Sequence, residues 1–131
     1  MNQATIDGLR EIQQDIHKTA NDKGWWDDRH LLVEVAARHS PELGRFARVM
    51  VQAANIALMH SELSESLEAA RHGNPSDDKI PLFRGVEAEQ ADTIIRILDD
   101  AEGSGHDVIG ALQAKMEMNE TRTFKHGGKA F

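Results

Sequence analysis

Apolar residues recur every three or four positions through most of this chain, the spacing of one face of an α-helix. Between Gln3 and Lys23 the stripe consists of Ile6, Leu9, Ile12, Ile16 and Ala20. The same spacing predicts a short helix over His30–His39 and longer helices over Pro41–His72, Val86–Glu102 and His106–Arg122. Helix formers dominate and Tyr is absent. We therefore predict an all-α fold, a bundle of four main helices plus a short helix.

Short breaks separate these segments. Ser40 can cap the helix that starts at Pro41, because its side chain accepts a bond from an early backbone N–H and proline suits the first helical position. Gly24 and Gly73 each follow a basic residue, an arrangement typical of helix ends. The chain contains no linker, repeat or low-complexity block, so we expect residues 1–131 to form one domain.

The longest predicted helix carries an apolar stripe that consists of Ala47, Val51, Ala54 and Leu58. Continuing this stripe leads to Glu62 and Glu65, so we expect both carboxylates to face inward. An inward-facing acid is costly unless it is paired or bound to a metal. The alternative is that the stripe drifts around the helix and leaves the two acids in solvent.

Glu89 and Asp92 repeat the three-residue spacing on the next long helix. Residues three apart are neighbours on a helix surface, so two packed helices would bring four carboxylates together. Four unpaired anions repel one another strongly, and a cation between them removes that cost. Oxygen ligands without His or Cys suit Mg²⁺, with Mn²⁺ as a substitute. Because Mg²⁺ commonly accompanies phosphates, we expect a phosphorylated ligand.

Composition excludes several classes of partner. The formal net charge of −7 argues against nucleic acid, and the absence of cysteine excludes disulfides and thiolate metal sites. The first residues lack the features of a signal peptide, and no apolar run approaches the roughly 20 residues that cross a bilayer. We therefore expect a cytoplasmic protein without a membrane partner.

Two further groups of residues are candidates for ligand contacts. Trp25 and Trp26 cannot both face one stripe of a helix; one can stack on a nucleobase, or both can anchor the core or an oligomer interface. Lys115, Asn119 and Arg122 project from one face of the last predicted helix. That face is either an ordinary solvated surface or a set of phosphate contacts.

The ordered acids resemble the signature of the all-α nucleoside triphosphate pyrophosphohydrolases, in particular the MazG-like proteins of bacteria and phages. Glu62 and Glu65 match Glu-x-x-Glu, and Glu89 and Asp92 match Glu-x-x-Asp. Further similar segments are Lys23–Asp28, His60–Glu65 and Asn119–Lys129. The similarity covers nearly the whole chain, and the ordered set is far more specific than a single Glu-x-x-Glu.

The resemblance implies hydrolysis between the α- and β-phosphates of a nucleoside triphosphate, giving the monophosphate and pyrophosphate. It implies that Mg²⁺ is held by Glu62, Glu65, Glu89 and Asp92. Glu62 or Glu65 would share the role of general base, since Ser61 stands where some members carry an additional acid. Implied substrate contacts are Trp25, Trp26, Lys115, Asn119, Arg122 and Lys125. Family members have sites completed by a neighbouring protomer, so a homodimer or tetramer is expected.

Three other interpretations compete with this one. Phosphoribosyl-ATP pyrophosphatase activity ranks lower, because the Trp-Trp segment and the Gly-rich tail look MazG-like. A non-catalytic helical oligomerisation module would leave the acids solvated. A di-iron bundle is disfavoured, because such bundles use Glu-x-x-His and this sequence contains none.

Overall fold

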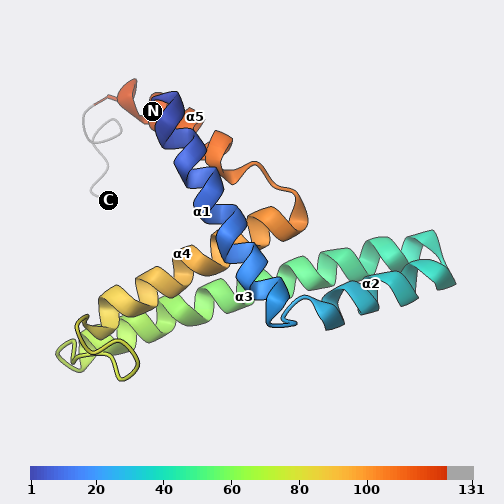
Figure 1. The fold of residues 1–131 in the computed structure, drawn as a ribbon, viewed down its shortest axis with the longest axis horizontal. Helices are drawn as coiled ribbons and strands as arrows, with labels where there is room; N and C mark the ends of the chain where they lie inside the picture. The colour runs from blue at the N-terminus through green and yellow to red at the C-terminus, as the bar shows by residue number, and fades with distance from the viewer. Residues whose placement is uncertain (124–131) are drawn as a thin grey trace.

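The computed structural model describes residues 1–123 and consists of five α-helices joined by turns and one longer loop (Figure 1). The helices are α1 (Gln3–Asp22), α2 (Asp27–His39), α3 (Pro41–Arg71), α4 (Gly85–Ser104) and α5 (Val108–Glu120). No β-strand occurs among the described residues, so the predicted all-α class is confirmed. None of the described helices combines the length and the apolar composition that a bilayer span needs.

The start of α2 differs most from the sequence prediction. The helix begins at Asp27, whereas the apolar pattern predicted His30. Asp27 and Asp28 lie in its first turn, where the exposed backbone N–H groups and the helix dipole stabilise negative charge. Gly24, with a φ of +74°, turns the chain out of α1 just before this point.

Two helices, α2 and α4, lie along α3, the longest element (Figure 1). α2 runs back along the first half of α3, α4 packs along the second half, and α1 crosses α4. α5 lies beside the start of α1. The contact between α2 and α3 is close, because a Cβ on Gly44 would lie 2.8 Å from the Cα of Ala37. Glycine at this position therefore sets the spacing of the α2–α3 hairpin.

Caps fix where the two central helices begin. Ser40 accepts a hydrogen bond from the Leu43 N–H at 3.1 Å with proline following it, as the sequence predicted. At the start of α4, the Asn74 side chain accepts from the Val86 N–H at 2.9 Å. The Glu87 carboxylate accepts from the Arg84 N–H at 3.0 Å. These bonds tie the loop to α4 and fix where α4 begins.

The hydrophobic core is small. Buried Ile6, Leu98 and Ile109 form its centre, so it joins α1, α4 and α5. The predicted α1 stripe is only partly buried, since Ile12 is 51% exposed. Many large apolar side chains on α2, α3 and α4 are exposed as well, which leaves much apolar surface uncovered in a single chain.

Candidate metal centre and adjoining cavity

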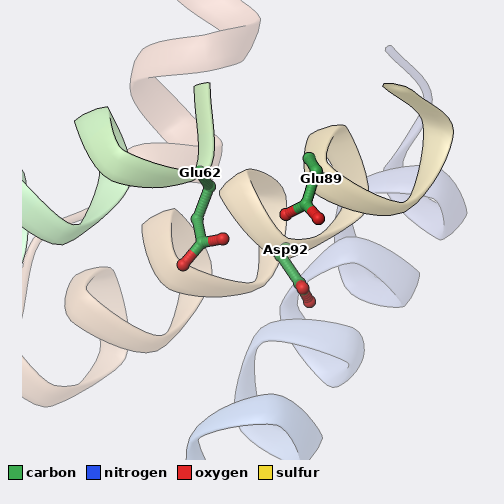
Figure 2. Close-up of side chains that lie close together, drawn as sticks. All are labelled: Glu62, Glu89 and Asp92. Carbon is green, nitrogen blue, oxygen red and sulfur yellow. The ribbon is translucent and has the colours of Figure 1, made fainter. Parts of the chain in front are cut away.

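Three of the four predicted acids converge at the packed faces of α3 and α4. Figure 2 shows Glu62 from α3 beside Glu89 and Asp92 from α4. One carboxylate oxygen from each lies within 4.8 Å of the other two. The three acids therefore offer a common coordination point. Glu65 is exposed and does not belong to this group.

The register of α3 explains why Glu62 and Glu65 differ. The covered face runs through Ala47, Asn55 and Glu62, whereas the predicted stripe ran through Ala54 and Leu58. Asn55 donates to buried Asp100 of α4 at 2.6 Å, so a polar pair occupies the helix contact where an apolar residue was expected. Glu62, 6% exposed, follows Asn55 on this face. The expectation that Glu65 also faces inward was wrong, because Glu65 is exposed and α4 covers only the Glu62 side of this half of α3.

Arg96 is the cation nearest to Glu62. Its Nε donates to the Glu62 carboxylate, so the ion pair joins α4 to α3 inside the acidic group. A buried carboxylate needs such a partner, since an unpaired charge in the interior is strongly unfavourable. Arg96 lies one helical turn after Asp92, on the same face of α4.

Burial and the neighbouring acids both act on the pKa of the Glu89 carboxyl. Burial is the largest cause that raises the pKa of its carboxyl above the ordinary value. The negative charge of Glu65 and a hydrogen bond with Glu62 raise this pKa further. The charges of Asp92 and Glu62 act in the same direction. Glu65 therefore lies near enough to affect the centre, although its oxygens are outside the group of three.

The donor set fits Mg²⁺ in its chemistry. Mg²⁺ binds oxygen at about 2.0–2.1 Å, so two ligand atoms on opposite sides of the ion are about 4.2 Å apart. The observed spread of 4.8 Å or less is close to that span, and small side-chain rotations would bring the oxygens to it. Mg²⁺ usually keeps several water ligands, so three carboxylates leave positions for water or phosphate.

A cavity of about 590 Å³ lies beside the acids, between α1 and α4. This volume falls in the range of small-molecule sites. The lining residues are Asp15, Ile16, Thr19, Ala20, Trp25, Arg29, Asp92, Ile95, Arg96 and Asp99. Asp92 belongs to both the acidic group and the cavity wall. A ligand in the cavity would therefore reach a metal ion held by the acids.

The two tryptophans point to different environments. Trp25 is 59% exposed and lines the cavity, whereas Trp26 is 3% exposed. The Trp26 indole Nε1 donates to the Asp99 carboxylate at 2.9 Å, and His17 Nδ1 lies 2.7 Å from the same carboxylate. The guanidinium carbon of Arg29 lies 5.0 Å from the Trp26 ring centroid. Trp25 is thus placed to contact a ligand, and Trp26 supports the wall behind it.

Asp99 was not singled out in the sequence. It joins α1 and the turn before α2 to α4, because it accepts from Trp26 and pairs with His17. The sequence does contain a signal for Asp99. Asp92, Arg96 and Asp99 are spaced four and three residues apart, so they share one face of α4, and all three line the cavity.

The predicted phosphate contacts lie elsewhere. Lys115 and Asn119 are exposed on α5, which packs beside α1, and neither lines the cavity. Arg122 follows the end of α5 and does not line the cavity either. Lys125 and the Gly-rich tail lie outside the described residues. Within one chain, the described part therefore does not bring the α5 residues to the acids.

The chain matches no protein-family model, no curated protein and no solved structure. The chemistry of the site residues is therefore the basis for a functional conclusion.

Proposed function

We propose that this protein is a Mg²⁺-dependent nucleoside triphosphate pyrophosphohydrolase, similar to the MazG-like enzymes. The observation that supports the proposal best is that Asp92 is shared between the acidic group and the cavity. A metal ion at the acids would hold the phosphates, and the cavity would take the nucleoside. A single ligand with a polyanionic end and a planar apolar end fits both parts.

The acids alone repel a triphosphate, so Mg²⁺ is central to the chemistry. When bound, it neutralises phosphate oxygens and lowers the pKa of a water ligand. Glu62, Glu89 and Asp92 would hold the ion. Glu65, exposed beside them, would accept a proton from the attacking water, since its negative charge already acts on the centre. The products would be a nucleoside monophosphate and pyrophosphate.

Arg96 has a defined part in this scheme. In the metal-free protein its guanidinium neutralises Glu62. Metal binding would weaken that ion pair, because the ion takes over the neutralisation. Arg96 also lines the cavity, so its guanidinium would then be available to a phosphate oxygen.

The cavity accounts for recognition of the nucleoside. Trp25 offers an exposed aromatic face for stacking, and Ile16 and Ile95 supply apolar walls. The α5 residues Lys115 and Asn119 would contact phosphates only if a second protomer supplied them. The proposal therefore includes a homodimer or a tetramer, acting in the cytoplasm where nucleoside triphosphates are made.

The test is a screen of ribo- and deoxynucleoside triphosphates with Mg²⁺, with detection of pyrophosphate and identification of the monophosphate. We expect pyrophosphate release with at least one nucleotide, and none without a divalent cation. Glu62→Gln and Asp92→Asn should each abolish release while circular dichroism retains the helices. Glu117→Gln, an exposed acid on α5, is the matched control and should keep full activity. Activity retained in Asp92→Asn would refute the metal assignment.

A non-catalytic oligomerisation module is the second candidate, and the exposed apolar side chains of α3 favour it. The two candidates differ in their response to Mg²⁺. An enzyme with this centre is stabilised by Mg²⁺ in a thermal melt, since a ligand that binds only the folded state raises the melting temperature. A module with solvated acids shows neither this shift nor any hydrolysis.

A further inference from the structure

Arg29 is a half-buried arginine without an oxygen partner anywhere in residues 1–123. In this part of the chain the half-buried arginines are Arg29 and Arg96, and all the others are exposed. Arg96 forms an ion pair with Glu62, whereas the Arg29 guanidinium forms neither an ion pair nor a hydrogen bond among the described residues. A guanidinium that is partly removed from water without an anion beside it is unfavourable. A bound anion would supply the missing partner.

The place of Arg29 in α2 adds to this cost. Arg29 lies in the first turn of the helix, which begins at Asp27. The positive end of the helix dipole disfavours a cation there and favours the acids Asp27 and Asp28. Neither acid forms an ion pair with Arg29 in the part of the chain that the structure describes. Local helix structure therefore gives no reason for an arginine at this position.

Trp26 fixes the position of the Arg29 guanidinium. The guanidinium carbon lies 5.0 Å from the centroid of the Trp26 ring, a cation–π contact. Trp26 is 3% exposed, and its indole Nε1 donates to the Asp99 carboxylate at 2.9 Å. The ring also packs closely on Gly103, where a Cβ would lie 2.3 Å from it. Because Trp26 is held on several sides, Arg29 is positioned before any ligand binds.

Arg29 faces the cavity beside the acidic group. Arg29 and Arg96 both line this cavity of about 590 Å³, and both also line a small pocket next to it. The two guanidiniums therefore share one part of the wall, and Arg96 connects that part to the acids through Glu62. Trp25 and Ile16 line the large cavity alone and supply apolar surface there.

The carboxylates near the two arginines are engaged elsewhere. Asp99 accepts from Trp26 and pairs with His17. Asp100, which lines the small pocket, accepts from Asn55 at 2.6 Å and from Ser104 at 3.0 Å. None of the described acids thus supplies the partner that Arg29 lacks.

We propose that Arg29 binds a phosphate group of the ligand, within the same chain that supplies the acids. A guanidinium donates two parallel hydrogen bonds to phosphate oxygens, which suits a fixed arginine at a cavity wall. The inference rests on the proposed function, which makes the ligand a nucleotide with its nucleoside in the cavity. Since Arg29 lines the cavity and lies outside the acidic group, the group it meets is the phosphate attached to the nucleoside. This phosphate stays on the monophosphate product.

The contact has two consequences for the site. Arg29 offsets the negative charge of Asp15 and Asp92 on the cavity wall, which would otherwise repel a phosphate. It also needs no second protomer, whereas Lys115 and Asn119 on α5 do not line the cavity of their own chain.

Binding of reaction products measures this contact without catalysis. Isothermal titration calorimetry of the full chain with Mg²⁺ compares the four common deoxynucleoside monophosphates with the matching deoxynucleosides. We expect Arg29→Met to weaken monophosphate binding by about tenfold or more, the size of one charge-assisted hydrogen bond. Nucleoside binding should change by less than about twofold, because the substitution removes only a phosphate contact. Arg29→Lys keeps the charge and should recover part of the loss.

Arg48→Met is the matched control. Arg48 is an exposed arginine on α3 that does not line the cavity, so the variant should bind both kinds of ligand as the parent does. Unchanged monophosphate binding by Arg29→Met would overturn the proposal. An equal loss of monophosphate and nucleoside binding would also overturn it, since Arg29 would then only support Trp26 and the cavity.

The parent chain itself gives a further test. A parent that binds monophosphates no more tightly than nucleosides, or that binds neither, would overturn the phosphate contact. The proposed hydrolysis fails separately, if no triphosphate releases pyrophosphate. The ratio of the two Kd values would still test Arg29 in that case.

Discussion

Replacing Glu89 by glutamine tests the electrostatic basis of the candidate metal centre. The substitution keeps the size of the side chain and removes one negative charge from the group of acids. In the metal-free protein this charge is unfavourable, since burial and neighbouring acids raise the pKa of Glu89. Glu89→Gln should therefore stabilise the metal-free protein and at the same time weaken Mg²⁺ binding.

The magnitude follows from the separation of the acids. Two unit charges at 4.8 Å or less repel by about 1 kcal/mol in a water-like medium, the appropriate limit because Asp92 is exposed. For a chain of this length, about 1 kcal/mol corresponds to a change of about 4 °C in melting temperature. By contrast, Mg²⁺ at a hundredfold excess over its Kd stabilises the parent by about 2.7 kcal/mol, or about 10 °C. The two effects have opposite signs and are measurable separately.

Thermal melts with and without Mg²⁺, followed by circular dichroism, measure both effects. We expect Glu89→Gln to melt about 4 °C above the parent without metal and to lose most of the Mg²⁺-induced shift. Glu120→Gln, an exposed acid at the end of α5, is the control and should behave as the parent.

The pH dependence gives a second readout of the same group. The folded protein holds the Glu89 proton to a higher pH than the unfolded chain does, because the folded pKa is raised. The stability linked to this proton is present below the ordinary pKa and is lost as the pH rises through the raised pKa. The metal-free parent should lose stability over this range, and Glu89→Gln should lose less. A variant that melts below the parent at neutral pH without metal, yet keeps the full Mg²⁺ shift, would refute the reasoning.

Three further predictions concern the walls of the site. Trp25→Ala should change the ranking of nucleotides while the Kd of Mg²⁺ stays within about twofold, and an unchanged ranking would exclude stacking. Asp99→Ala removes the acceptor of Trp26 and should destabilise the protein by about 1–3 kcal/mol, which a calorimetric scan would register as a melting temperature about 4–12 °C lower. Gly103→Ala should destabilise similarly, since its Cβ would lie 2.3 Å from the Trp26 ring; a neutral result would contradict the packing.

The sequence by itself predicted the helices and the three acids that the structure brings together. Helical periodicity located all five elements, and Ser40 followed by Pro41 placed the start of α3 correctly, because a cap is a local interaction between neighbours. The spacing of the acids predicted that four carboxylates converge, since residues three apart share a helix face, and the structure groups three of them, Glu62, Glu89 and Asp92, without Glu65. The Mg²⁺ site and the hydrolytic activity stay predictions that the experiments above address.

The tertiary structure decided which face of each helix is covered, because that depends on the partner helix and not on local spacing. Only the packing of α3 on α2 and α4 shows that Asn55 and Glu62 turn inward, while Glu65 and large apolar side chains such as Phe46 stay exposed. The same packing made Trp26 a support of the wall and Trp25 a part of the cavity. The role of Asp99 appeared only when α1 crossed α4, since its partners His17 and Trp26 lie far away in the sequence.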